Sequence, residues 1–337
     1  MIRPFALVIA TLTAPPVLAQ EPDHAALRER ALIVLETQFA AFRDTSADLA
    51  SRAERHCSKG IPKDVFADQF RATWLAWAPL DAYQFGPIEQ CGAVLSIGFW
   101  PDKKGYVGRG VKNLLTLPAE TLSDPATIAQ ASAAAQGLPA IEYLLDSDLP
   151  VCPAVIGLSA NLRVMGQMLY DDWFAPDGWA DLARAAGPAN PIYLSEAEFT
   201  KALFTAVDFG LTRMIDLRLG RPLGTFDRPM PRRAEAHRSG LSLDILDTQL
   251  AELSRLIQDG LGDATGPKGP EILAEFDAER AKIDRFDAPL DQLVSDPIGR
   301  FRVEGLLSDI QVIHSRLATD LGPALGVKSG FSAADGD

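Results

Sequence analysis

The sequence is poor in two residue types that build many metal and catalytic sites, with four histidines and three cysteines among 337 residues. None of the histidines is followed, three or four positions later, by an Asp or Glu that a helix would place on the same face. The HExxH motif of metalloproteases and the GxSxG motif of serine hydrolases are absent. A histidine metal site of that local form is therefore excluded. A site of oxygen ligands from several helices stays open, with Glu142 and Asp102 as candidates.

Long apolar runs are also missing after the first residues of the chain. Residues 4–18 are apolar, but prolines interrupt this run, and it is shorter than the ~18 residues that indicate a membrane span. Arg3 precedes it, and Val17-Leu18-Ala19 fits the small-residue pattern of a cleavage site. We therefore expect a signal peptide over residues 1–19, cleavage after Ala19, a periplasmic or cell-envelope location, and no membrane span in the mature protein.

Basic residues are outnumbered, with 32 Lys and Arg against 45 Asp and Glu, for a formal net charge of −13. An acidic surface of this kind argues against nucleic acid and against anionic lipid as partners.

The three cysteines of an exported chain allow one disulfide and leave one residue over. Cys57 and Cys152 both fall at predicted helix ends, where the ends of a bundle can meet, so we predict that they pair. Cys91 lies in a glycine-rich stretch and is the residue left over.

Apolar residues recur at helical spacing along most of the chain, and no strand-like alternation of any length is found. The fold class is therefore all-α, with an N-terminal helical bundle over residues 20–175, a C-terminal bundle over 190–325 and a disordered tail over 326–337. The predicted helices cover residues 27–57, 62–85, 122–145, 158–169, 195–217, 246–257, 271–293 and 306–317.

The stretch GLPAIEYLL, residues 137–145, breaks the rules of its predicted helix. Gly137 and Pro139 both disfavour a helix interior, and Pro139 lacks the N–H that would pair with the carbonyl of Ala135. A kink is therefore predicted there, next to the single carboxylate of Glu142. Two interpretations stay open: a functional site around Glu142, or a structural kink where Glu142 pairs with an arginine.

Two irregular segments are expected to meet this stretch. Residues 86–110 hold six glycines and two prolines but match neither a P-loop nor a dinucleotide fingerprint. Residues 228–240 form a basic loop in an acidic protein, which could face a carboxylate or bind an anion. Ser239 is a helix N-cap or a contact residue. Around Glu142 we predict two polar neighbours and one wall, namely Asp102, Arg238 and Trp100.

Four stretches together resemble the imelysin-like family, also called peptidase family M75. The resemblance implies an exported protein of two helical bundles related as a duplicated unit, an iron-regulated or iron-uptake context for some members, and a Gly-x-His-x-x-Glu motif near the bundle interface. The stretches are FGPIE (85–89), FWPDKKG (99–105), GLPAIEYLL (137–145) and RRAEAHRSGLSL (232–243).

The chain departs from that motif at one position, because Pro139 stands where the family has histidine. Gly137 and Glu142 carry over, so Glu142 is the remaining candidate ligand for a divalent or iron ion. A metal or general-base role loses its main ligand without the histidine. His237 lies where the resemblance implies a frequent tryptophan, and it could turn toward the vacated position.

We therefore predict a non-catalytic protein of the cell envelope that binds a small ligand or a metal ion, with a link to iron uptake implied by the resemblance. The ligand could be an iron-related metal ion, a small anion or a peptide. Two alternatives are kept: an M75-type metallopeptidase, and a structural protein that docks an envelope partner.

Overall fold

The computed structural model describes residues 21–327, so the predicted signal peptide and most of the predicted tail lie outside the described residues. Helices dominate this part of the chain, and it contains no β-strand beyond an isolated bridge between Thr225 and Arg228. The all-α prediction is therefore confirmed. No helix in the described range is both long enough and apolar enough to cross a membrane.

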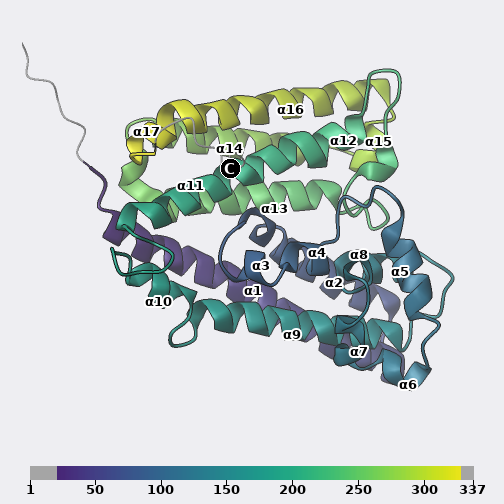
Figure 1. Cartoon of the computed structure of the whole chain (residues 1–337). Helices are drawn as coiled ribbons and strands as arrows, with labels where there is room; N and C mark the ends of the chain where they lie inside the picture. Colours follow the sequence, from purple (N-terminus) through teal and green to yellow (C-terminus); the bar gives the residue numbers. More distant parts are fainter. Residues whose placement is uncertain (1–20, 328–337) are drawn as a thin grey trace, which may run out of the picture.

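The long helices form two groups that lie one above the other in Figure 1. The N-terminal group is built on α1 (His24–Lys59), α2 (Lys63–Trp77) and α9 (Ala154–Phe174). The second group consists of α11 (Glu196–Arg213), α13 (Ser242–Arg255), α14 (Gly269–Ile283) and α16 (Pro297–Arg316).

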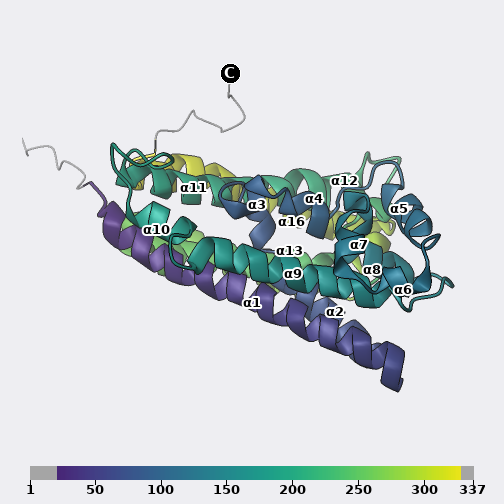
Figure 2. The same cartoon turned by 60° about the horizontal axis from the view of Figure 1, so that its bottom comes forward.

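The two groups pack directly, because α1 contacts both α11 and the π-helical segment η5 (Leu256–Leu261) that continues α13. The turned view in Figure 2 shows α1 and α9 running side by side. That the groups are a duplicated unit, and that domains divide at 175 and 190, stays a prediction. The intervening segment carries the short helix α10 (Trp179–Arg184).

Short helices fill the chain between α2 and α9, and several gather at the right-hand end of the molecule in Figure 1. They are η1 (Leu80–Ala82), α3 (Pro87–Gln90), α4 (Ala93–Ile97), α5 (Tyr106–Leu114), α6 (Ala119–Leu122), α7 (Pro125–Ala129), η2 (Ala133–Ala135) and α8 (Leu138–Leu145).

Three predicted element boundaries are wrong. The helix predicted over 122–145 is instead the last residue of α6 followed by α7, η2 and α8, because prolines and glycine start new helices there instead of interrupting one. The helix predicted over 271–293 ends at Ile283 and resumes only as α15 (Leu290–Leu293), before which Pro289 stands. Much of the segment 86–110, predicted as a loop, is helical.

The aromatic stripe of α2 belongs to the core. Phe66, Phe70, Trp74 and Trp77 are each at most 2% exposed. Phe70 and Trp74 stack edge to face at 5.5 Å between ring centroids, and Trp77 packs against Phe42 of α1 at 5.3 Å. The stripe thus packs α2 against α1. Trp74 also lines the cavity described below.

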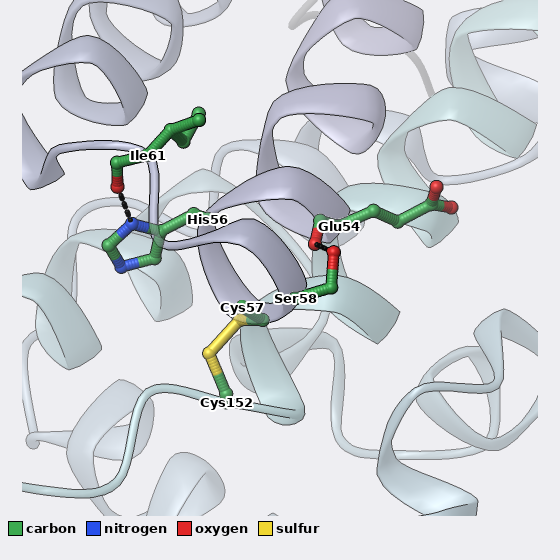
Figure 3. The surroundings of a disulfide bond; sticks show 6 residues. All are labelled: Glu54, His56, Cys57, Ser58, Ile61 and Cys152. Atoms are coloured by element: carbon green, nitrogen blue, oxygen red, sulfur yellow. Dashed lines mark hydrogen bonds between the residues drawn. A yellow bond between two sulfur atoms is a disulfide. The ribbon is translucent and has the colours of Figure 1, made fainter.

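A disulfide joins Cys57, near the end of α1, to Cys152, just before α9 (Figure 3), which is the predicted pair. Their Cα atoms are 5.9 Å apart. The turn beside it is held by His56, whose Nδ1 lies 2.8 Å from the carbonyl oxygen of Ile61. Cys91 is exposed and carries a free thiol.

Candidate functional site

A cavity of about 150 Å³ lies where α8 meets the segment 99–107, α12 (Gly220–Leu223) and the segment 232–238. Figure 1 shows α5, α8 and α12 close to this end of the molecule. The predicted convergence of three irregular segments is what builds the cavity. Its apolar walls include Trp74, Phe99, Trp100 and Pro139, and its polar lining is Asp102, Lys103, Glu142, Arg221, Arg232, Arg233, His237 and Arg238.

Glu142 lies in the middle of α8 and is 3% exposed. Its Oε1 accepts two hydrogen bonds from Ser239, from the backbone N–H at 3.0 Å and from the hydroxyl at 2.7 Å. Its Oε2 lies 3.7 Å from Nη1 of Arg238. Burial raises the pKa of Glu142, and the Ser239 bonds and the Arg238 charge offset only part of this rise. The same side chain borders a second cavity of about 310 Å³.

Gly137 and Pro139 start α8 and do not kink it, so the predicted kink is wrong. Gly137 is the N-cap residue, with extended φ −120° and ψ −159°. Pro139 is the second helical residue, where the missing N–H would have had no helical partner in any case. Pro139 lines the cavity and Gly137 does not. A Cβ on Gly137 would lie 2.1 Å from the carbonyl oxygen of Ile97, so this glycine lets α8 approach α4.

We expect Gly137→Ala to lower the free energy of unfolding by about 1–3 kcal/mol, because the added methyl would force the backbones of α8 and α4 apart. Gly305 on α16 provides the matched control, since a Cβ there meets nothing within 4 Å. Gly305→Ala is expected to stabilise by about 0.5–1 kcal/mol through helix propensity. Urea denaturation of both variants checks this. Equal effects at the two positions would show that the close approach of α8 and α4 does not restrict the size of the side chain at position 137.

Asp102 lines the cavity, but its carboxylate is occupied by the start of α5. Oδ1 accepts from the backbone N–H of Tyr106 at 2.8 Å, and Oδ2 accepts from that of Val107 at 3.0 Å. These bonds satisfy backbone donors that the first turn of a helix leaves free. Asp102 is thus positioned as a helix cap on the cavity wall.

The predicted neighbours of Glu142 on the basic loop do contact it. Arg238 lies between Glu142 and Asp146, with its Nε 3.5 Å from Oδ2 of Asp146. Its guanidinium carbon also lies 5.4 Å from the centroid of the Tyr143 ring. Ser239 is not a helix cap, because the next helix, α13, begins at Ser242. It is a contact residue whose two donors hold one oxygen of Glu142.

Four further basic residues line the cavity besides Arg238. Within residues 21–327, the side chains of Lys103, Arg221, Arg232 and Arg233 take part in no hydrogen bond or ion pair, although the protein carries a net charge of −13. The half-buried His237 is part of the same lining, and burial, followed by the charge of Arg238, lowers its pKa. The cavity therefore has an excess of positive charge, which attracts anions and repels cations.

These surroundings do not fit the predicted role of Glu142 as a metal ligand. No group of three or more His, Cys, Asp or Glu residues in the described chain is arranged to hold a metal ion. Oε2 of Glu142 forms an ion pair with a guanidinium, whereas hard cations require several oxygen ligands. His237 and Pro139 line the same cavity, but a histidine and one paired carboxylate do not make a closed coordination shell.

A second group of buried charges, which the sequence did not reveal, lies between the two groups of helices. Asp81 in η1 is 2% exposed, and its Oδ2 accepts from Arg213 at 3.1 Å and from Arg218 at 2.6 Å. Its Oδ1 accepts from the amide of Gln249 in α13 at 2.8 Å. Arg218 lies in the π-helical segment η3 (Met214–Leu219) that continues α11, and its Nε lies 2.8 Å from Oε2 of Glu235.

This network has two carboxylates and two guanidiniums, so it is neutral overall. Burial opposes the ionised form of Asp81, but the charges of Arg213 and Arg218 outweigh burial and hold its pKa below the usual range. For Glu235 the balance is reversed: burial raises its pKa despite the nearby Arg218. The guanidinium carbon of Arg213 also lies 6.0 Å from the Trp100 ring centroid, which links the network to the cavity wall.

One feature of the sequence could have pointed to this network. Asp81 is the only charged residue between Arg71 and Glu89, in an apolar run that resembles the surroundings of Glu142. A lone carboxylate in a stretch fit for burial needs a partner from elsewhere in the fold. No local pattern identifies Arg213 and Arg218 as those partners.

The fold and the site define an all-helical protein with two packed groups of long helices and a basic cavity at one end, lined mainly by short helices and loops. The family model of imelysin, peptidase family M75, matches residues 36–317, and the chain belongs to this family. No protein with a curated description matches the sequence.

Two solved structures share the fold. An imelysin-like protein from Psychrobacter arcticum 273-4 is 20% identical, with a TM-score of 0.77, and the match covers 94% of this chain and all (100%) of the other. A putative iron-regulated protein A precursor from Parabacteroides distasonis ATCC 8503 is 13% identical, with a TM-score of 0.66, over 92% of this chain and 98% of the other. At these identities the comparison shows the fold alone.

Proposed function

We propose that this imelysin-family protein is exported to the cell envelope and binds a small anion in the cavity beside α8, without catalysing a reaction. The observation that carries the proposal is a set of four basic side chains on one cavity that have no partner among residues 21–327. They are Lys103, Arg221, Arg232 and Arg233. The signal-peptide pattern over residues 1–19 supports export.

The size and lining of the cavity narrow the class of ligand. A volume of about 150 Å³ accommodates a molecule of roughly six heavy atoms, the size of benzene. Guanidinium groups bind carboxylate and phosphate oxygens in pairs of parallel hydrogen bonds. An inorganic oxyanion or a short carboxylate with two or more negative charges meets both requirements.

A link to iron uptake enters as part of this proposal. It is supported by the family and by the name of the iron-regulated relative from Parabacteroides distasonis. Because the cavity is positively charged, iron would have to arrive as a negatively charged complex, one acidic group of which occupies the cavity.

The two arginines at positions 232 and 233 test the proposal. We expect the double variant Arg232→Gln/Arg233→Gln to bind sulfate, phosphate or succinate at least about tenfold more weakly, because each charged hydrogen bond contributes about 1.5–3 kcal/mol. Arg228→Gln is the matched control, since Arg228 belongs to the same basic loop but does not line the cavity. Isothermal titration calorimetry measures the anion affinity of the parent, the double variant and Arg228→Gln. Equal affinity of the double variant and the parent would contradict the proposal.

The structural alternative has one observation in its favour, which is the pairing of Glu142 with Arg238 and Ser239. On that alternative, substitutions in the cavity would change stability and leave every ligand interaction unchanged. The calorimetric comparison above separates the two alternatives. Arg232 and Arg233 are exposed and have no partner in the described part of the chain, so replacing them should not destabilise the fold.

A further inference from the structure

We propose that Glu142 couples anion binding to proton uptake: the bound anion draws Arg238 away, and Glu142 then takes up one proton from solvent at Oε2. This inference rests on the proposed function and concerns the same cavity. The neutral carboxyl group would then donate a hydrogen bond to the anion, so the motif carboxylate changes from a repelling charge to a ligand.

The two oxygens of Glu142 are held unequally, and this makes the change feasible. Oε1 is fixed by two hydrogen bonds from Ser239. Oε2 has only the charge of Arg238 at 3.7 Å, which is longer than a hydrogen bond. Arg238 is itself shared with Asp146 at 3.5 Å, and its side chain is 29% exposed. A ligand can therefore take Arg238 without disturbing the anchored oxygen.

Electrostatics drives the proton in the same direction. Glu142 is already buried, and burial raises its pKa. An anion in the adjacent cavity adds a like charge at close range and occupies the cation that stabilised the ionised form. Each of these changes favours the protonated carboxyl group, so the complex holds more protons than the free protein.

Several other charged groups face Glu142 from the elements packed around it. Asp102 is held as the cap of α5, so His237, whose pKa is lowered in the free protein, is the competing proton acceptor beside a bound anion. The experiment must therefore separate Glu142 from His237. The full set is Lys63, Asp68 and Arg71 of α2, Asp146 of α8, Asp102 and Lys103, Arg221 of α12, and Arg232, Arg233, His237 and Arg238.

The affinity for the anion is expected to depend on pH. Because the complex binds more protons, anion affinity increases as the pH falls through the window between the pKa of Glu142 in the free protein and its higher pKa in the complex. Below that window the affinity levels off. Glu142→Gln keeps the shape and removes the charge, so it should bind the anion about tenfold more tightly than the parent above the window. A metal-ligand role predicts the opposite effect of this substitution.

The test uses sulfate, which stays a dianion from about pH 5 to about pH 8.5, a range in which perturbed carboxyl and imidazole groups titrate. Calorimetric titrations of the mature protein in buffers of different ionisation enthalpy give the number of protons taken up on binding. We expect the parent and His237→Asn to take up as much as one proton in the window and Glu142→Gln to take up none. Ser239→Ala retains the carboxyl group but removes one donor to Oε1, so its window should move to higher pH.

The outcomes separate the inference from the proposed function. Sulfate binding by the parent without proton uptake at any pH would overturn the inference alone. Uptake that persists in Glu142→Gln and disappears in His237→Asn would also overturn it, by assigning the proton to the histidine. If sulfate binds to none of the proteins while their circular dichroism and melting temperatures show them folded, the proposed function fails and the inference fails with it.

Discussion

Replacing Asp81 by alanine is expected to lower the free energy of unfolding by about 3–5 kcal/mol, the usual cost of breaking a buried ion pair. Asp81 Oδ2 accepts from both Arg213 and Arg218, so within the described residues its loss leaves Arg213 without an ion-pair partner and Arg218 with Glu235 alone. The side-chain amide of Gln249 would also lose one of its two acceptors and keep only the carbonyl oxygen of Ala78. A loss of this size is a large part of the stability of an ordinary domain.

The control is an exposed pair in the same protein. Asp287 forms an ion pair with Arg302 at 3.4 Å, and its side chain is 83% exposed. Asp287→Ala should cost less than about 1 kcal/mol, because solvent screens such pairs. Urea denaturation followed by circular dichroism measures both. A loss for Asp81→Ala as small as that for Asp287→Ala would mean that the network contributes no more than a surface pair.

Removing the disulfide is expected to destabilise the protein by a similar amount. The bond closes a loop with a sequence separation of 95 residues, and the loop-entropy model assigns about 4–5 kcal/mol to a loop of this length. The double variant Cys57→Ser/Cys152→Ser should therefore unfold at a clearly lower urea concentration than the parent. Reducing agent should shift the parent to the same midpoint and leave the variant unchanged.

Cys91 supplies the control for this experiment. It is exposed and free, and its thiol contacts only nearby carbonyl oxygens in its own turn. Cys91→Ser should keep both the midpoint and the sensitivity to reducing agent. If reducing agent does not change the urea midpoint of the parent, the two ends of the loop stay close in the unfolded chain even without the bond. The disulfide would then remove little conformational entropy from the unfolded state.

Local pattern was enough to predict the long helices. The 3.6-residue spacing of apolar side chains in α1, α2, α9, α11, α13 and α16 reports which face of each helix is buried, and that information is contained within a few turns. The prediction failed at residues 122–145, where small apolar residues suit both one helix and several short ones. There the extended backbone of Gly137, pressed against Ile97, decides where α8 begins.

The site was predictable as a set of segments but not as a chemical environment. The lone Glu142, the glycine-rich stretch and the basic loop were each visible as departures from helical pattern, and all three border one cavity. Whether that cavity attracts a cation or an anion depends on which charges are already paired. Asp102 is held by the backbone N–H groups at the start of α5, and Glu142 is held by Ser239 and Arg238, which are more than ninety positions away in the sequence.

The sequence by itself thus determined the helical class and the positions of most long helices, because these depend on interactions between residues a few positions apart. It also contained the segments of the candidate site and the pair of cysteines that the structure joins. Only the tertiary structure decided the sign of the cavity's charge, the role of Pro139 and the buried network around Asp81. Each of these depends on contacts between groups that are distant in sequence. The free-energy cost of burying a charge depends on which partners the fold places beside it.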